Sequence, residues 1–393
     1  MLSVFEKGIM ELIRCALNGT EPHLEEGFDL EAAYEFAQQR QITPLLYYGA
    51  VNIPGFMNTL AGKKFFKSTM QYAYNSAEQI AMINSIAEAF KGASVSFLKL
   101  KGTLLKEMYP YPEMRLMSDA DILIKVEEYD TVKPIMQRLG FEEIQTESDH
   151  ELVWRSSFLM VELHKRLIPS YNKDYYSYFG DGWRLAQSKS DSSEYSMKDE
   201  DNFIYLFIHF AKHYRDAGIG IKHLTDFYVF LQKVGELDWQ YIEKEFKKLQ
   251  VFDFWKNIEK VLDAWFANGE WNDVSEFIVH RIIGSGAYGN EEDHIQSEAV
   301  KLSKANKSGK QIKKEKMLYL IFFPYDRMCV RFPFLKKFPF LLPIMWVWRW
   351  IDAVLFRRKN IAKKKREIDA ISQEKIDSYQ NELNYVGLDF NFE

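Results

Sequence analysis

Two carboxylates stand two positions apart, at Asp119 and Asp121, where an apolar segment begins. Side chains alternate between the two faces of a strand, so both carboxylates share one face while Ala120 and Ile122 point into the core. Adjacent carboxylates repel each other unless a cation lies between them. The pair therefore predicts a divalent metal site on this strand.

A turn upstream of the pair has the composition of a phosphate site. It follows an apolar strand expected over 95–100 and opens a helix expected over 103–108. Glycine lets the backbone approach an anion closely, and the N–H groups at the start of a helix point toward it. A lysine adds a fixed positive charge, and an arginine grips phosphate through two hydrogen bonds. We expect phosphate contacts from Lys101, Gly102, Thr103, Arg115 and Ser118.

A later strand, expected over 158–164, supplies a third carboxylate. Alternation places Glu162 and His164 on one face of this strand, opposite two apolar side chains. With the aspartate pair, Glu162 would complete an oxygen-rich site suited to Mg²⁺ or Mn²⁺. Alternatively, Glu162 forms only a salt bridge with Lys165 or Arg166, the two basic residues that follow.

These motifs resemble the polymerase-beta-type nucleotidyltransferase superfamily, and most of all a bacterial branch described as uncharacterised nucleotidyltransferases. The matching positions are Lys101-Gly102, Tyr109-Pro110, Arg115, Asp119 and Asp121 with Ile122-Leu123, and Glu162 with His164. The similarity continues more weakly through His209, His213 and Asp226 into the C-terminal part. This chain has Lys-Gly where superfamily members often have Gly-Ser, and a glutamate where the third acid is commonly aspartate.

The resemblance implies an α+β fold with a polymerase-beta-like nucleotidyltransferase domain, in which helices pack a mixed sheet. It also implies transfer of a nucleoside monophosphate from an NTP, with ATP expected, and release of pyrophosphate. The acceptor would be an unknown hydroxyl on a small molecule or a protein. Asp119, Asp121 and Glu162 would be catalytic and would hold the metal, Mg²⁺ or Mn²⁺. One alternative keeps the fold without catalysis, as a nucleotide-binding or regulatory module.

Several polar residues have structural alternatives. His209 and His213 are four residues apart on an expected helix, which is the spacing of a zinc-binding pair. No glutamate follows His209 directly and no cysteine is nearby, so a packed or hydrogen-bonded role is favoured for both. Asp226 is expected to cap or brace a helix. Arg115 has a similar alternative, which is to brace the loop before the strand.

Hydrophobic patterning divides the chain into four regions. These are a helical N-terminal region over 1–92, the nucleotidyltransferase core over 93–185, a helical domain over 186–300, and a basic and aromatic helical C-terminal region over 301–393. The first region should contain helices over 4–17, 30–40 and 61–91. The core should also contain a helix over 128–138 and strands over 120–126, 141–146 and 151–155.

Composition limits the class of protein. The 393 residues are 47% hydrophobic, enough to fill more than one core. The net charge of −5 argues against a surface that binds nucleic acid throughout, so nucleic acid is not expected as a partner. The two cysteines, Cys15 and Cys329, exclude a disulfide framework. The first residues lack the pattern of a secretory signal, and we expect a cytoplasmic protein.

An aromatic segment near the C-terminus has two interpretations. Residues 338–356 are about as long as a bilayer span, but Pro343, Arg349 and Asp352 make the segment a poor one. Seven basic residues follow within 357–366. Apolar residues followed by a basic cluster suit an interfacial membrane helix, and 338–366 would then be a peripheral membrane or nucleic-acid contact. The favoured alternative is a helix buried against the helical domain, with a solvated basic tail.

Overall fold

The structure is a computed structural model that describes residues 2–144, 151–170, 172–190, 192–216, 218–286, 291–303, 307–356 and 358–389. The chain forms two compact units. The first comprises Met1–His213, Ile219–Gly289 and Val386–Glu393, and the second comprises Tyr214–Gly218 and Asn290–Tyr385. The N-terminal helices thus share one unit with the sheet. The fourfold division at 92, 185 and 300 stays a prediction.

The first unit begins with the predicted helices, α1 (Val4–Asn18), α2 (Leu30–Arg40) and α4 (Leu60–Gly92), with α3 (Thr43–Ala50) between the last two. Ser3 starts α1 with a capping box that includes Glu6, and Gly19 ends it in the left-handed conformation. A short 3₁₀ turn, η1 (Phe56–Asn58), precedes α4. These helices confirm the periodicity found over 4–17, 30–40 and 61–91.

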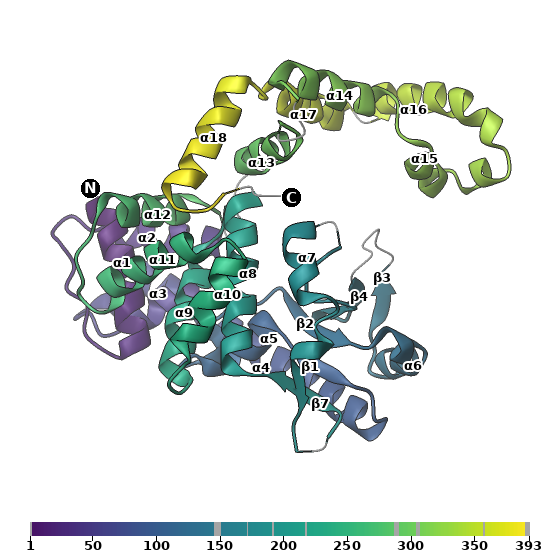
Figure 1. The fold of residues 1–393 in the computed structure, drawn as a ribbon. Helices are drawn as coiled ribbons and strands as arrows, with labels where there is room; N and C mark the ends of the chain where they lie inside the picture. Colours follow the sequence, from purple (N-terminus) through teal and green to yellow (C-terminus); the bar gives the residue numbers. More distant parts are fainter. Residues whose placement is uncertain are drawn as a thin grey trace. The chain divides into compact units, whose positions relative to one another are not determined.

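The first unit contains a mixed sheet (Figure 1) of seven strands in the order β3-β4-β5-β2-β1-β7-β6. The strands are β1 (Phe97–Lys99), β2 (Asp119–Ile124), β3 (Glu142–Ile144), β4 (Glu151–Arg155), β5 (Met160–His164), β6 (Ala186–Ser188) and β7 (Glu194–Met197). The pairs β2–β5 and β1–β7 are parallel and the other four are antiparallel. This mixed sheet with helical flanks confirms the predicted α+β class.

One face of the sheet carries the hydrophobic core. Ala120 and Ile122 are buried there, as alternation predicts, together with Val161 and Leu163 of the neighbouring strand. They pack in one cluster with side chains of α4 and of α6 (Tyr129–Arg138), among them Ile83, Ile86, Phe90, Val132 and Ile135. The opposite face is therefore left for the polar residues of β2 and β5.

The segment after β1 returns the chain to β2 through short elements. These are α5 (Lys101–Leu105), η2 (Lys106–Met108) and η3 (Pro112–Met114), and η4 (Val126–Glu128) then leads into α6. The sheet also continues past residue 185, through β6 and β7. Both of these strands are short and polar, so they lack the alternation by which a strand is recognised in a sequence. Part of the predicted strand 141–146 lies outside the described residues.

Helices complete the first unit. They are α7 (Lys173–Phe179), α8 (Asp199–Asp216), α9 (Ile221–Lys233), α10 (Trp239–Lys248), α11 (Phe252–Phe266) and α12 (Asp273–Gly284), with η5 (Trp183–Leu185) before β6. Phe203 of α8 fixes this set, because its ring contacts the rings of Phe227, Trp239, Phe246 and Trp255. The buried aromatic cluster orients the polar face of α8.

The second unit is helical. It contains α13 (Glu291–Ser303), α14 (Gly309–Ile321), α15 (Tyr325–Arg331), α16 (Leu342–Phe356), α17 (Arg358–Asp369) and α18 (Gln373–Tyr385), with η6 (Pro333–Lys336) and η7 (Pro339–Leu341) before α16. Among the helices of the described ranges, none combines the length and the apolar character that crossing a bilayer requires. The cytoplasmic location stays a prediction.

Candidate active site

The parallel pairing of β2 with β5 brings three ionisable side chains together. The register places Asp121 opposite Glu162 and Leu123 opposite His164. Residues opposite each other in a ladder share a face, so Asp121, Glu162 and His164 lie on the polar face of the sheet. The buried alternate residues fix this register, because a slip of one position would turn the carboxylates into the core.

The distances within this group are short. The Oδ1 atom of Asp121 lies 2.7 Å from Nε2 of His164 and 2.7 Å from the ammonium nitrogen of Lys101. The Nε2 atom of His164 is also 3.6 Å from Oε2 of Glu162. One donor atom from each of Asp121, Glu162 and His164 lies within 4.8 Å of the others. Asp121 and His164 are almost fully buried, and Glu162 is partly exposed.

The crowded carboxylates alter one another's protonation. Burial and the charges of Asp121 and Asp119 raise the pKa of Glu162 to about 8. Burial and the Asp121 charge also raise the pKa of Asp119. For Asp121 burial acts in the opposite direction, but the charge of Lys101 and the hydrogen bond with His164 hold its pKa well below the usual value. Asp121 is therefore ionised at neutral pH, while Glu162 retains a proton.

The donor set fits one divalent ion. Asp121 and Glu162 offer carboxylate oxygens, and His164 offers an imidazole nitrogen once its proton is on Nδ1. Burial and the charge of Lys101 lower the pKa of His164, which favours the neutral ring that a metal needs. Carboxylates suit Mg²⁺ and Mn²⁺, and an imidazole shifts the preference toward transition metals such as Mn²⁺.

The sequence prediction and this group overlap in two residues. Asp121 and Glu162 come together as expected, whereas Asp119 lies outside the group of three, and its role as a ligand stays a prediction. His164 received no role from the sequence. Its position two residues after Glu162, on the same face of the strand, could have indicated a role in the site. That role follows only once the register between β2 and β5 is known.

The predicted phosphate turn supports β2 directly. The Thr103 hydroxyl accepts a hydrogen bond of 2.8 Å from the backbone N–H of Asp121. Lys101 adopts a positive φ of 44°, a conformation unusual for a residue with a side chain, and directs its ammonium to Asp121. Gly102 is buried against Arg115 and Met117. Phosphate contacts of this turn, and of the exposed Ser118, stay predictions.

Arg115 takes the bracing role that the sequence left open. Its guanidinium donates two hydrogen bonds, of 2.7 and 2.9 Å, to the carboxylate of Asp226 on α9, and a third to the carbonyl of Leu116. The Tyr109 hydroxyl donates to the same carboxylate at 2.8 Å. Both partners of the ion pair are buried, so Asp226 braces α9 against the loop before β2. A phosphate contact of Arg115 stays a prediction.

The helical histidines lie near Lys101. The Nε2 atoms of His209 and His213 are 3.1 Å apart, so one ring donates a hydrogen bond to the other. Burial, together with the charges of Lys101 and His213, lowers the pKa of His209 well below its usual value. Within the described ranges, the three ionisable residues of β2 and β5 are the one group with metal-site geometry. The two rings thus make the hydrogen bond that the sequence favoured, and their purely structural role stays a prediction.

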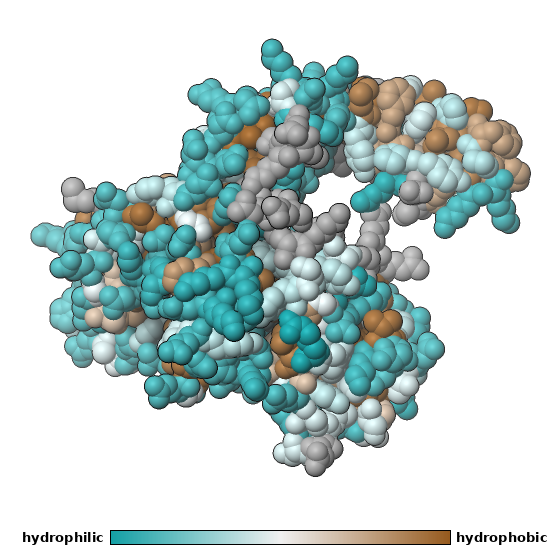
Figure 2. Space-filling model, in the orientation of Figure 1, coloured by the Kyte–Doolittle hydropathy of each residue, from teal (hydrophilic) through white to brown (hydrophobic). Residues whose placement is uncertain are grey.

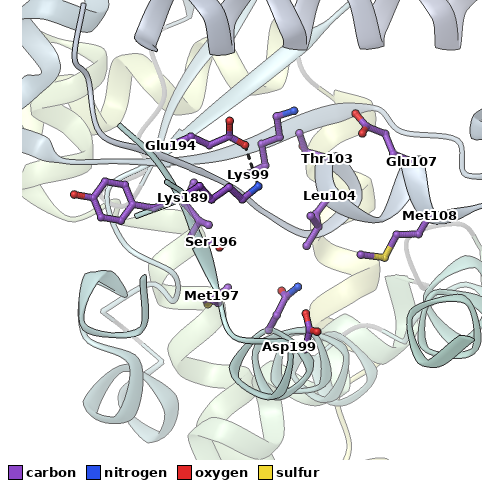
Figure 3. A pocket seen from close by; sticks show the side chains of 13 residues that line it. Lys99, Thr103, Leu104, Glu107, Met108, Lys189, Glu194, Ser196, Met197 and Asp199 are labelled. Carbon is purple, nitrogen blue, oxygen red and sulfur yellow. Dashed lines mark hydrogen bonds and ion pairs between the residues drawn. The ribbon is translucent and has the colours of Figure 1, made fainter. Parts of the chain in front are cut away.

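A cavity of about 420 Å³ lies beside the turn, between β1, β7 and the start of α8 (Figure 3). Its lining carries both charges, from Lys99, Lys189, Glu107, Glu194 and Asp199. Thr103 lies next to both the cavity and the carboxylates. It lines the cavity, and its hydroxyl accepts the hydrogen bond from the backbone N–H of Asp121.

One of three comparisons with known proteins gives a match. The model of a family described as uncharacterised nucleotidyltransferases matches residues 26–267, more than half of the chain. The chain belongs to this family. The match contains all seven strands and the three ionisable residues of β2 and β5. No curated protein and no solved structure matched the chain in the other two comparisons.

The bracing ion pair predicts a loss of stability. Asp226→Ala would leave the buried Arg115 charge without its carboxylate, which costs about 3–5 kcal/mol. We expect urea unfolding to show this loss, and the exposed control Asp130→Ala to stay within about 0.5 kcal/mol of the wild type. A variant with wild-type stability that no longer binds nucleotide would contradict the bracing role and favour phosphate binding by Arg115.

The raised pKa of Glu162 predicts how stability depends on pH. The folded, metal-free protein keeps a proton on Glu162 up to about pH 8, whereas the unfolded chain releases it near the usual value of 4.5. The stability from this group is therefore present below pH 4.5 and lost as the pH rises through about 8. We expect the Tm of chelator-treated protein to fall over this interval, and to fall less in Glu162→Gln.

The same Tm measurement is repeated with Mn²⁺ added. Because a metal must displace the proton of Glu162, Mn²⁺ should raise the Tm more near the upper end of the interval than in its middle. Glu142→Gln on β3, which is exposed, is the matched control and should behave as wild type. Identical pH profiles for wild type and Glu162→Gln would show that Glu162 titrates like an ordinary glutamate.

Proposed function

We propose that this protein is a metal-dependent nucleotidyltransferase that moves a nucleoside monophosphate from an NTP to a hydroxyl acceptor and releases pyrophosphate. The supporting observation is the group formed by Asp121, Glu162 and His164 on one sheet face, in a chain of the nucleotidyltransferase family. The acceptor would be a small molecule or a protein, and ATP is the expected donor.

Asp121, Glu162 and His164 would hold the metal, with Asp119 beside them. When bound, a divalent ion neutralises phosphate charge and lowers the pKa of an acceptor hydroxyl. Asp119 keeps a carboxylate of raised pKa, which makes it a better proton acceptor than an ordinary aspartate. We assign to it the removal of the proton from the acceptor hydroxyl, as that oxygen attacks the α-phosphorus and pyrophosphate leaves.

Lys101 would bind the phosphates of the nucleotide. Although burial opposes it, the Asp121 charge raises the pKa of Lys101, so the side chain remains an ammonium at neutral pH. A fixed cation at this place would stabilise the negative charge that develops on the leaving pyrophosphate. The buried Tyr205, whose pKa is raised to about 12 by burial first of all, stays protonated near this ammonium.

A second candidate function is supported by the same lysine. The Lys101 ammonium lies 2.7 Å from an Asp121 oxygen, so the chain itself supplies a cation for the carboxylates. A protein that had lost catalysis could keep this ion pair and bind a nucleotide only for regulation. The two candidates differ in one result, which is transfer of the nucleoside monophosphate.

The first experiment is a thermal-shift series with ATP, GTP, CTP and UTP, each with Mg²⁺ or Mn²⁺. A ligand present at about 100 times its Kd stabilises the folded state by about 2.7 kcal/mol, which corresponds to a rise in Tm of several degrees. Asp121→Asn should abolish the metal-dependent rise, and Asp130→Asn, an exposed aspartate on α6, should retain it.

Transfer is measured with the nucleotide that gives a shift, labelled at its α-phosphate and incubated with protein and small-molecule fractions of a cell extract. Label transfer by wild type and not by Asp121→Asn supports the transferase. A metal-dependent shift without transfer to any fraction supports the regulatory module. The absence of a shift with every nucleotide and both metals would contradict both candidates.

A further inference from the structure

The second unit exposes an apolar stripe along α16. Its members are Ile344, Trp348, Ile351, Leu355 and Phe356 of α16 with Phe340 of the preceding η7, and their exposed fractions run from 48% to 79%. From Ile344 to Leu355 they recur at intervals of three and four residues, so they lie along one side of the helix. In Figure 2 hydrophobic surface gathers over the end of this unit that α15 and α16 form. A group of exposed apolar side chains of this kind marks an interaction site.

The charged groups of α16 have partners within the unit instead. Arg349 is 7% exposed and donates to the backbone carbonyls of Leu320 and Ile321. Its guanidinium also lies 3.6 Å from the centre of the Phe323 ring. Asp352 forms an ion pair of 2.7 Å with Arg331. Both charges of the segment 338–356 are thus used within the unit, and the apolar stripe carries no charge.

Two tryptophans fix the orientation of the helix. The indole N–H of Trp346 donates to the carbonyl of Phe323, and that of Trp350 donates to the carbonyl of Ile321. Their rings also contact Phe322 edge to face. The face of α16 that packs inward is therefore already occupied, and the stripe is not a core face that lacks its partner within the unit.

Basic residues stand at both ends of the stripe. Lys336 and Lys337 precede it, and α17 follows with Arg358, Lys363 and Lys365 among its exposed side chains. Interfacial helices have this combination, because their apolar face enters the acyl boundary while lysines and arginines contact anionic headgroups. Indole rings such as that of Trp348 also favour this boundary.

We propose that the apolar stripe of α16 docks on an anionic lipid bilayer and lies in its interface. The 15 residues of α16 span about 22 Å, less than the roughly 30 Å of a hydrocarbon core, so the helix would lie along the surface. The overall charge of −5 gives no general attraction to anionic lipid, which makes the basic residues next to the stripe decisive. RNA fits less well, because the stripe offers no cation to a phosphate backbone.

The test is sedimentation of the full chain with two kinds of vesicle, phosphatidylcholine alone and phosphatidylcholine mixed with phosphatidylserine. Wild type should sediment with the mixed vesicles, less with the neutral ones, and less again at high salt. Leu355→Glu should lower the partition constant about tenfold or more, because it replaces an exposed apolar side chain that would enter the bilayer interface.

The matched control makes the same change at a similar exposure. Leu60 of α4 is 65% exposed and Leu355 is 59% exposed, so Leu60→Glu should leave vesicle binding unchanged. Circular dichroism and the Tm of both variants should match the wild type, since neither leucine is buried. Lys365→Gln with Arg366→Gln should weaken binding to the mixed vesicles and leave binding to neutral ones as it was.

Three results would overturn the proposal. The first is no sedimentation with either vesicle, and the second is an equal loss in Leu355→Glu and Leu60→Glu. The third is a wild-type dimer, measured by light scattering, that Leu355→Glu converts to a monomer while vesicle binding is unchanged. That result would assign the stripe to a second copy of the chain. In the first case, RNA that binds wild type but not Leu355→Glu would assign the stripe to nucleic acid.

Discussion

The repulsion between carboxylates on one face of β2 and β5 is the constraint on which the site depends. Asp121 and Glu162 are opposite each other in the ladder, and the register cannot slip because the other face carries the core. The charges are balanced locally, since Lys101 pairs with Asp121 and Glu162 holds a proton. The Thr103 hydroxyl and the core on the opposite face hold this unfavourable group in place.

Much of this group could be predicted from the sequence, and the reason is alternation. The spacing of Asp119 and Asp121 fixed a shared face, and the apolar residues between and after them fixed the opposite one. Register could not be predicted, because it depends on two strands about 40 residues apart in sequence. His164 therefore had no role until its strand was placed. The pair of Arg115 with Asp226 joins residues even further apart, and no periodicity indicates it.

The aromatic C-terminal segment is a second case in which the sequence pattern alone does not determine the packing. Its apolar residues recur at helical intervals, but the period alone cannot tell which side of the helix packs. Both sides of α16 are rich in apolar atoms, so its polar atoms determine which side packs against the unit. Arg349, Trp346 and Trp350 all find backbone carbonyls within the unit, so that side packs and the stripe remains exposed. Satisfying buried polar groups, rather than burying the most apolar surface, orients this helix.

The carboxylate group of the sheet and the apolar stripe of α16 follow one thermodynamic rule. Carboxylates crowded on a sheet and an apolar stripe in water each lower the stability of the isolated chain. A partner that relieves the charge repulsion, or that covers the apolar surface, binds the folded state. The free energy gained in this way contributes to its affinity. A divalent cation would fill this role for Asp121 and Glu162, and a bilayer would fill it for the stripe. Because the two sets share no residue, a cation and a bilayer would each bind without requiring the other.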